Sequence, residues 1–129
     1  MVQAINLHNN ATITRSQFHP IGNTYFSIGK DNSVYEYEIR FTGYLHKFKL
    51  DHEPTALEVM HNGNIVIGDS NGTLSWYDRF GSFLKKVDGS SAVSMMAADW
   101  SRSLLAVGRE REHTFEFYTY EDAFDLELH

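Results

Sequence analysis

Seven histidines are the residues of this 129-residue chain best suited to bind a metal or to move a proton. A metal site is usually announced by ligands at short, regular spacing, such as two histidines four residues apart on a helix. No two of these histidines have that spacing, and His19 precedes a proline in an expected turn. We therefore expect no metal site and no cofactor. The histidines are His8, His19, His46, His52, His61, His113 and His129.

Other catalytic patterns are also missing from the sequence. It contains neither the Gly-x-Ser-x-Gly turn that presents a nucleophilic serine nor a glycine-rich phosphate loop. Two pairs of glutamates, Glu36 with Glu38 and Glu110 with Glu112, are two residues apart and would share one face of a strand. A solvated strand face explains such pairs more simply than acid and base catalysis. We predict that the protein is not an enzyme.

Composition limits the class of protein. Hydrophobic residues make up 42% and charged residues 22%, which is typical of a folded domain rather than a disordered chain. The chain has no cysteine, which excludes disulfides and thiolate zinc sites and favours an intracellular, cytoplasmic location. A formal net charge of -6 argues against a nucleic-acid partner. Apolar runs are too short to span a membrane, and the first ten residues do not resemble a signal peptide.

The sequence contains an internal repeat with a period of about forty residues. Any functional site must be built on the structure that this repeat forms. The glycines Gly29, Gly68 and Gly108 are 39 and 40 residues apart, and the tyrosines Tyr37, Tyr77 and Tyr118 are 40 and 41 apart. Each glycine precedes a polar turn and then a strand rich in aromatic residues. The repeats occupy about residues 11–50, 54–88 and 92–129.

Turn signals inside the repeats predict strands throughout. Asp31-Asn32 and Asn71-Gly72 tolerate positive φ and are flanked by β-branched or aromatic residues, as in hairpins. Further polar turns are expected at residues 20–23, 61–64 and 100–103. Residues 91–98 suit a strand with Val93, Met95 and Ala97 facing inward. The chain is thus predicted to be all-β, with three four-stranded antiparallel propeller blades forming part of a β-propeller in a single segment, 1–129.

The repeat resembles the WD repeat, whose turn and third strand typically end in Asp-Gly-Thr-Val-x-Leu-Trp-Asp. Residues 31–38 and 71–78 follow this string, with Tyr37 and Tyr77 in place of the tryptophan, and residues 112–119, ending near Tyr118, follow it less closely. The resemblance implies a network of a histidine, a hydroxyl, the turn aspartate and the strand aromatic. Matched positions are Ser27, Asp31, Tyr37, His52, Asn71, Tyr77 and Tyr118.

No repeat carries that network in full. The second repeat has Ile67 where the hydroxyl is expected, and the first repeat has no histidine matched to the network. The second repeat also resembles the NHL type of propeller repeat, which remains the alternative family. Both resemblances imply blades.

Three blades are too few to close a ring, because propellers have four to eight. Either two chains associate to give six blades, or the chain associates with further blades of a longer propeller. Residues 2–7 could form an extra outer strand completing a blade of another chain. The alternating residues 123–129 predict an outer strand of the third blade, or alternatively a strand that docks on a partner's sheet edge.

The remaining function is surface recognition. Arg40 and Phe41, and likewise Arg79 and Phe80, fall in corresponding loops and could bind protein partners from one rim, unless the phenylalanines tuck against their own blades. The resemblance implies a non-catalytic protein-protein interaction scaffold of WD-repeat type, a subunit or portion of a larger propeller assembly. A propeller that binds a small ligand or carbohydrate is the alternative, and an isolated blade set without a biological partner is a third possibility.

Overall fold

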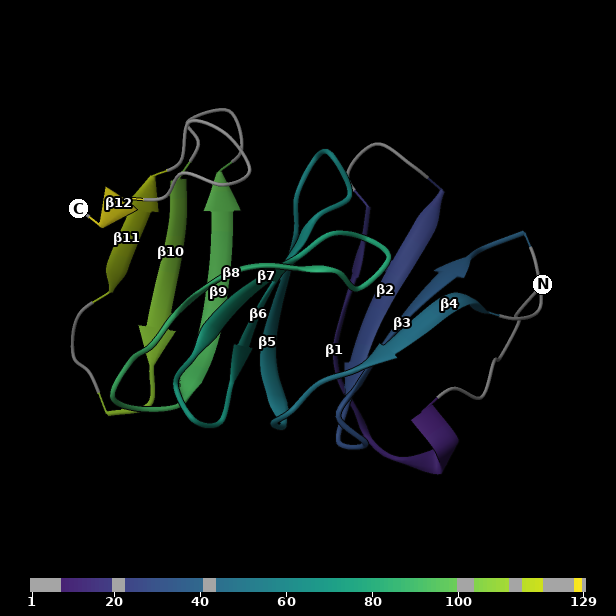
Figure 1. Ribbon diagram of the computed structural model, residues 1–129, viewed down its shortest axis with the longest axis horizontal. Helices are drawn as coiled ribbons and strands as arrows, with labels where there is room; N and C mark the ends of the chain where they lie inside the picture. Colours follow the sequence, from purple (N-terminus) through teal and green to yellow (C-terminus); the bar gives the residue numbers. More distant parts are fainter. Residues whose placement is uncertain are drawn as a thin grey trace.

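The computed structural model describes residues 8–19, 23–40, 44–99, 104–111, 115–119 and 127–128. A 3-10 turn, η1 (His8–Asn10), precedes twelve strands. The strands form three four-stranded antiparallel sheets, which lie side by side in chain order (Figure 1). We call them blades 1, 2 and 3. Blade 1 comprises β1 (Ile13–Phe18), β2 (Thr24–Gly29), β3 (Ser33–Glu38) and β4 (Tyr44–Lys49); blade 2 comprises β5 (Pro54–Val59), β6 (Ile65–Asp69), β7 (Leu74–Tyr77) and β8 (Phe83–Val87); blade 3 comprises β9 (Val93–Asp99), β10 (Leu104–Arg109), β11 (Glu116–Thr119) and β12 (Glu127–Leu128).

Each blade is a meander in which consecutive strands pair, and this confirms the predicted three-blade architecture. The predicted hairpin turns are confirmed by backbone angles, since Asn32 has φ 60° and Gly72 has φ 92°. The C-terminal strand pairs with β11, with Leu128 opposite Tyr118, as an outer strand of blade 3. Residues 2–7, expected to form an extra strand, lie outside the described residues.

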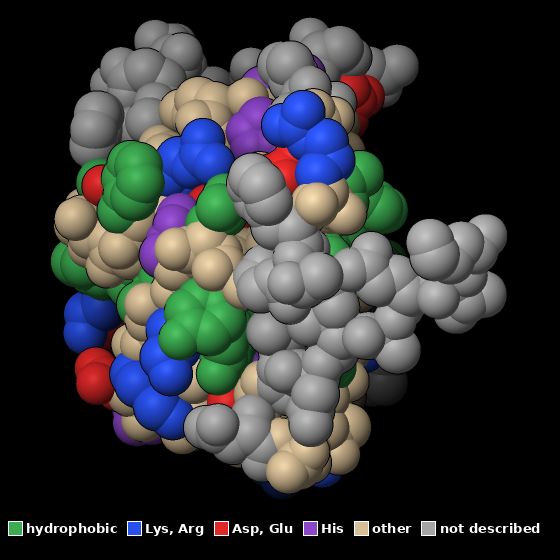
Figure 2. All heavy atoms as spheres, turned by 90° about the vertical axis from the view of Figure 1, so that its right-hand side faces the viewer, with side chains coloured by type: hydrophobic (Ala, Val, Ile, Leu, Met, Phe, Trp, Pro, Cys, Tyr) green, Lys and Arg blue, Asp and Glu red, His purple; other side chains and the backbone are tan. Residues whose placement is uncertain are grey.

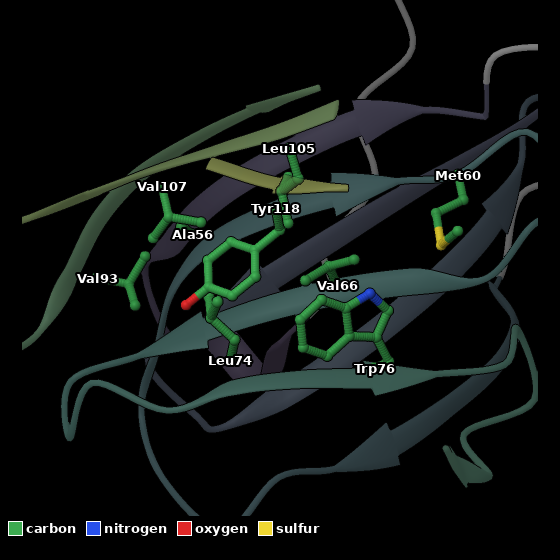
Figure 3. Packing of buried hydrophobic residues seen from close by; sticks show 9 residues of the cluster. All are labelled: Ala56, Met60, Val66, Leu74, Trp76, Val93, Leu105, Val107 and Tyr118. Carbon is green, nitrogen blue, oxygen red and sulfur yellow. The ribbon is translucent and has the colours of Figure 1, made fainter. Parts of the chain in front are cut away.

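Two apolar clusters join the blades. Phe26, Ile28 and Val34 of blade 1 pack against aliphatic side chains of blade 2, including Val59 and Ile65. The other face of blade 2 packs against blade 3, where Figure 3 shows Trp76 and Tyr118 among the aliphatic side chains of the cluster. Blade 2 is therefore covered on both faces. The members of this second cluster are Ala56, Met60, Val66, Leu74, Trp76, Val93, Leu105, Val107 and Tyr118.

The predicted orientation of β9 is wrong after its first residue. Val93 is buried, but Met95 and Ala97 are exposed, whereas Met96 and Ala98 pack on the core. The cause is a register shift: Val93 pairs with Arg109 and Met95 with the preceding Gly108. One extra residue in β9 reverses the alternation of every side chain that follows it.

The first strands of blades 1 and 2 lie beside one another, and a polar pair links them. Gln17 Nε2 donates to Glu58 Oε1 at 3.2 Å, and burial raises the pKa of Glu58 although this hydrogen bond opposes the rise. Among the described residues, no helix is long and apolar enough to cross a membrane.

The Glu58→Gln variant should be more stable than the wild type at neutral pH, by less than about 1 kcal/mol, because it removes a carboxylate that is costly to bury. A raised folded-state pKa means that this cost is present above the folded pKa and vanishes below the unfolded one. Urea unfolding at pH 7 and near pH 4 should show a gain that disappears in acid. A gain that persists at pH 4 would contradict the assignment.

Candidate functional site

The three blades share one position at the end of the second strand, beside the hairpin turn. Gly29, Asp69 and Arg109 occupy it, and each pairs with the first residue of its blade, which is Ile13, Pro54 or Val93. The strand register shifts at this position in each blade, but the three side chains are of different types. The space beside this position therefore differs from blade to blade: a side chain fills it in blades 1 and 3, and it is open in blade 2.

In blade 1 the space holds the ring of His8, which is fully buried. Its Nδ1 lies 2.8 Å from Asp31 Oδ1 and its Nε2 lies 2.8 Å from Ser27 Oγ. Tyr35 packs edge-on against the ring, with centroids 4.4 Å apart. A Cβ on Gly29 would lie 2.6 Å from His8 Nδ1, so the glycine leaves the room that the imidazole needs. The structure thus brings Ser27 and Asp31 together around His8, a residue that the repeat pattern does not predict.

Asp31 is charged more readily here than in an unfolded chain. Burial alone would raise the pKa of its carboxyl group, but the hydrogen bond and charge of His8, the Ser33 amide and the nearby Lys49 together lower that pKa below its ordinary value. The Ser33 amide donates to Asp31 Oδ1 at 3.3 Å. The carboxylate therefore holds both the histidine ring and the turn that follows it.

We expect Asp31→Asn to lower the free energy of unfolding by about 1 to 2 kcal/mol at pH 6, since hydrogen bonds to charged groups are the stronger ones. A depressed folded-state pKa contributes stability above the unfolded pKa, and that stability is lost as the pH falls through the folded value. The difference from wild type in denaturant titrations should accordingly shrink below about pH 4. An equal difference at pH 6 and pH 3 would argue against a charged Asp31.

In blade 3 the same space holds the guanidinium of Arg109, whose side chain is only 2% exposed. Its Nε donates to Glu116 Oε1 at 2.9 Å, and its Nη1 donates to the carbonyls of Gly72 at 2.6 Å and Ser91 at 2.9 Å. Since Gly72 belongs to the hairpin turn of blade 2, Arg109 also ties the two blades together.

In blade 2 the space is a cavity of about 370 Å³. The chain passes from β4 into β5 without inserting a ring, and His52 is exposed at this cavity rather than buried. The Asp69 carboxylate turns to its own hairpin, where Oδ1 accepts from the amides of Asn71 at 2.9 Å and Thr73 at 3.0 Å. Polar residues lining the cavity are Asp51, His52, Asp69, Thr73, Ser75, Tyr77 and Lys86.

Two carboxylates of this cavity act on the phenol group of Tyr77. Burial raises the pKa of Tyr77, and the carboxylates of Asp51 and Asp69 raise it further, although a hydrogen bond with Ser75 opposes them. Tyr77 also contacts Phe83 edge-on, with ring centroids 5.9 Å apart. The cavity therefore combines negative charge and hydroxyl groups with an aromatic wall.

The opposite end of blades 1 and 2 carries the arginines expected to bind partners. Arg79 Nη2 lies 2.6 Å from Glu36 Oε2, and His46 Nε2 lies 2.8 Å from Glu36 Oε1. Arg40 Nε lies 2.6 Å from Glu38 Oε1. Glu36 and Glu38 are both buried, so the predicted solvated face is wrong for this pair. The charges are stable there because the side chains of Arg79 and Arg40 lie against them and neutralise them.

These pairings change what each rim residue offers to a partner. Arg79 joins blade 1 to blade 2, whereas Arg40 is 72% exposed at its side chain. Phe80 is also 72% exposed and stands beside His46, with centroids 5.2 Å apart. Phe41 lies outside the described residues, as do His113 and His129. A role of Arg40 and Phe80 in partner binding stays a prediction.

The other matched repeat positions are separated in space. Tyr37 is half-buried on β3, two residues beyond the Tyr35 ring that contacts His8. Tyr118 is 3% exposed between blades 2 and 3, and its hydroxyl donates to Glu116 Oε1 at 3.3 Å. Among the described residues, no group of three metal-binding side chains comes together.

The outer face of blade 3 carries exposed apolar side chains. Met95 is 52%, Phe115 54% and Phe117 46% exposed. Met95 lies opposite Gly108 and Phe117 opposite Ala106, which are the places that Ala56 and Trp76 occupy in blade 2. Ala56 and Trp76 are buried there, 2% and 3% exposed, beneath blade 3. Blade 3 thus repeats an inter-blade contact surface that no described residue covers.

Neither a protein-family model nor a curated protein matches the chain. Solved structures do match it. U3-55K and the WD40 repeats of RRP9 each have 16% identity over 92% of this chain, with TM-score 0.78. The computationally designed Ika4 protein has 24% identity over 83% of this chain, with TM-score 0.68.

The chain spans only part of these structures, namely 65% of Ika4, 39% of U3-55K and 38% of RRP9. At such identities the likeness concerns the fold. Three four-stranded blades in 129 residues, with WD40 repeats as structural neighbours, show that the chain has the fold of part of a WD40-like β-propeller.

Proposed function

We propose that the protein is a non-catalytic interaction scaffold of WD-repeat type that works as a portion of a larger propeller assembly inside the cell. The observation that carries this proposal is the apolar outer face of blade 3. Met95, Phe115 and Phe117 stand where blade 2 presents Ala56, Leu74 and Trp76 to its neighbour. Exposed apolar patches of this kind mark protein contacts.

The partner that fits this face is a further propeller blade with aliphatic side chains on its facing side. Blade 3 covers blade 2 with Leu105 and Val107, and blade 2 covers blade 1 with Ile65 and Ile67. At the matching places, blade 1 has Tyr25 and Ser27, and Ser27 is buried beneath His8, to which it is hydrogen-bonded. Figure 2 shows the side of blade 1, where described hydrophobic side chains are interspersed with Lys, Arg and His.

These residue types favour blades from another segment or polypeptide over a ring of two copies with six blades. Blade 1 of a second copy would bring a tyrosine and a bonded serine to a surface that elsewhere receives aliphatic side chains. Contact between the two open blade 3 faces remains available to a second copy. The test below separates these arrangements by mass.

Multi-angle light scattering on the purified chain tests the open face. We expect a mass above the 14.8 kDa of one chain, because an apolar blade face that lacks its partner blades associates with other copies of itself, and a return to that mass in a Met95→Thr/Phe117→Thr variant. Phe80→Thr, which alters a more exposed aromatic residue elsewhere, should leave the mass unchanged. A single-chain mass at every concentration, or an oligomer that the double variant does not disturb, would overturn the proposal. A dimer whose mass does not change with concentration would identify a second copy as the occupant, whereas a mass that keeps rising with concentration indicates an open face that lacks its partner blades.

A further inference from the structure

Two of the three equivalent spaces in this chain hold a nitrogen-bearing side chain against a carboxylate. The imidazole of His8 lies against Asp31 in blade 1, and the guanidinium of Arg109 lies against Glu116 in blade 3. Blade 2 supplies carboxylates at the same space and leaves it open. The chain itself therefore shows what kind of group this space accommodates.

We propose that the cavity of blade 2 is a binding site for a guanidinium group, supplied by an arginine side chain of a partner protein. Three features set the ligand chemistry: Asp51 and Asp69 provide negative charge, Ser75 and Tyr77 provide hydroxyl acceptors, and Phe83 provides an aromatic wall. A planar guanidinium can donate to several acceptors at once and stack on an aromatic ring, which an ammonium cannot do. This inference is independent of the open face of blade 3.

Size also suits one side chain. About 370 Å³ lies at the small end of ligand sites, and the aliphatic stem of an arginine would contact Leu50 and Ile67. Ile67 stands where blade 1 has Ser27, and Ser75 stands where blade 1 has Tyr35. Replacing the tyrosine by serine removes the ring that supports His8 in blade 1 and creates part of this volume.

Lys86 is the one cation among the residues that line the cavity. Its side chain is exposed on β8 opposite Ser75. It competes with an incoming guanidinium for the carboxylates, so its removal should strengthen binding. Removing the positive charge of Lys86 should therefore strengthen guanidinium binding, and removing the negative charge of Asp51 should weaken it.

Isothermal titration with N-acetyl-arginine methylamide tests the site, using the citrulline analogue as a neutral control of the same shape. The arginine probe should bind with a dissociation constant of about 1 mM, and the citrulline analogue should bind at least about tenfold more weakly. Propylguanidine, a free alkyl guanidine with the same single charge, serves as a second probe: equal or tighter binding of propylguanidine would assign the site to a small molecule instead of a protein side chain.

Three variants identify the cavity. Asp51→Asn should weaken binding about threefold, because the side chain is exposed and its charge partly screened. Lys86→Gln should strengthen binding by a similar factor. Ser75→Tyr, which inserts the residue of blade 1, should abolish binding while thermal unfolding shows that the fold remains. If Ser75→Tyr does not fold, the opposite effects of Asp51→Asn and Lys86→Gln on the dissociation constant still test whether the probe binds in this cavity.

The proposal is overturned if arginine and citrulline probes bind equally, if neither binds, or if Asp51→Asn and Lys86→Gln have no effect or the same effect. The titrations can be run on the Met95→Thr/Phe117→Thr variant, in which the open face of blade 3 is altered. Binding by that variant separates failure of this site from failure of the scaffold proposal.

Discussion

Trp76→Ala should lower the free energy of unfolding by about 3 to 5 kcal/mol, the usual cost of truncating a large buried aromatic side chain. Trp76 is 3% exposed and lies in the cluster that joins blades 2 and 3 (Figure 3). Its removal takes apolar contacts from both sheets and leaves a cavity at their interface. Because a small domain is stable by only about 5 to 15 kcal/mol, much of the folded population should be lost at elevated temperature.

Urea unfolding followed by circular dichroism measures this loss. Phe80→Ala is the matched control, since Phe80 is 72% exposed on a loop and its truncation should change the free energy by no more than about 0.5 kcal/mol. Equal losses in the two variants would show that the packing between blades 2 and 3 does not stabilise the chain.

Arg109→Leu should cost about 3 kcal/mol, although leucine is apolar and the site is buried. The substitution leaves the carbonyls of Gly72 and Ser91 without their donor, and it removes the partner of Glu116. Arg109→Lys should recover only part of the loss, because one ammonium cannot reach three acceptors set around a planar group.

The matched control is Arg40→Leu. Arg40 also binds a glutamate, at 2.6 Å, but its side chain is 72% exposed, so its loss should cost less than about 1 kcal/mol. Chemical denaturation of the three variants gives the comparison. If Arg40→Leu proved as costly as Arg109→Leu, burial and the link to the turn of blade 2 would not be the source of the effect.

The three-blade architecture could be predicted from the sequence because each repeat is marked by residues that act locally, namely turn residues and recurring glycines. Gly29, Gly68 and Gly108 mark the period, and the hairpin turns are set by residues such as Asn32 and Gly72 that adopt positive φ. The face of β9 could not be predicted, because a single extra residue reverses the alternation and leaves no trace in composition.

The residues of the candidate site could be identified only once the pairing of the strands was known. His8 lies five residues before β1, so it does not stand at the histidine position that the second repeat suggested at His52. Glu36 looks like a solvated strand residue, but its partner Arg79 is 43 residues away in the next blade. The equivalence of Gly29, Asp69 and Arg109 appears only when each is seen opposite the first residue of its blade.

The position of blade 2 between two other sheets has a consequence for motion. Among the described parts of the three blades, only blade 2 has apolar clusters on both faces, so its strands can open only if contacts to both neighbours are lost. Blade 3 can separate by losing one cluster. Amide hydrogen exchange should therefore be slowest in β6 and β7 and faster in the strands of the outer blades, such as β10 and β11.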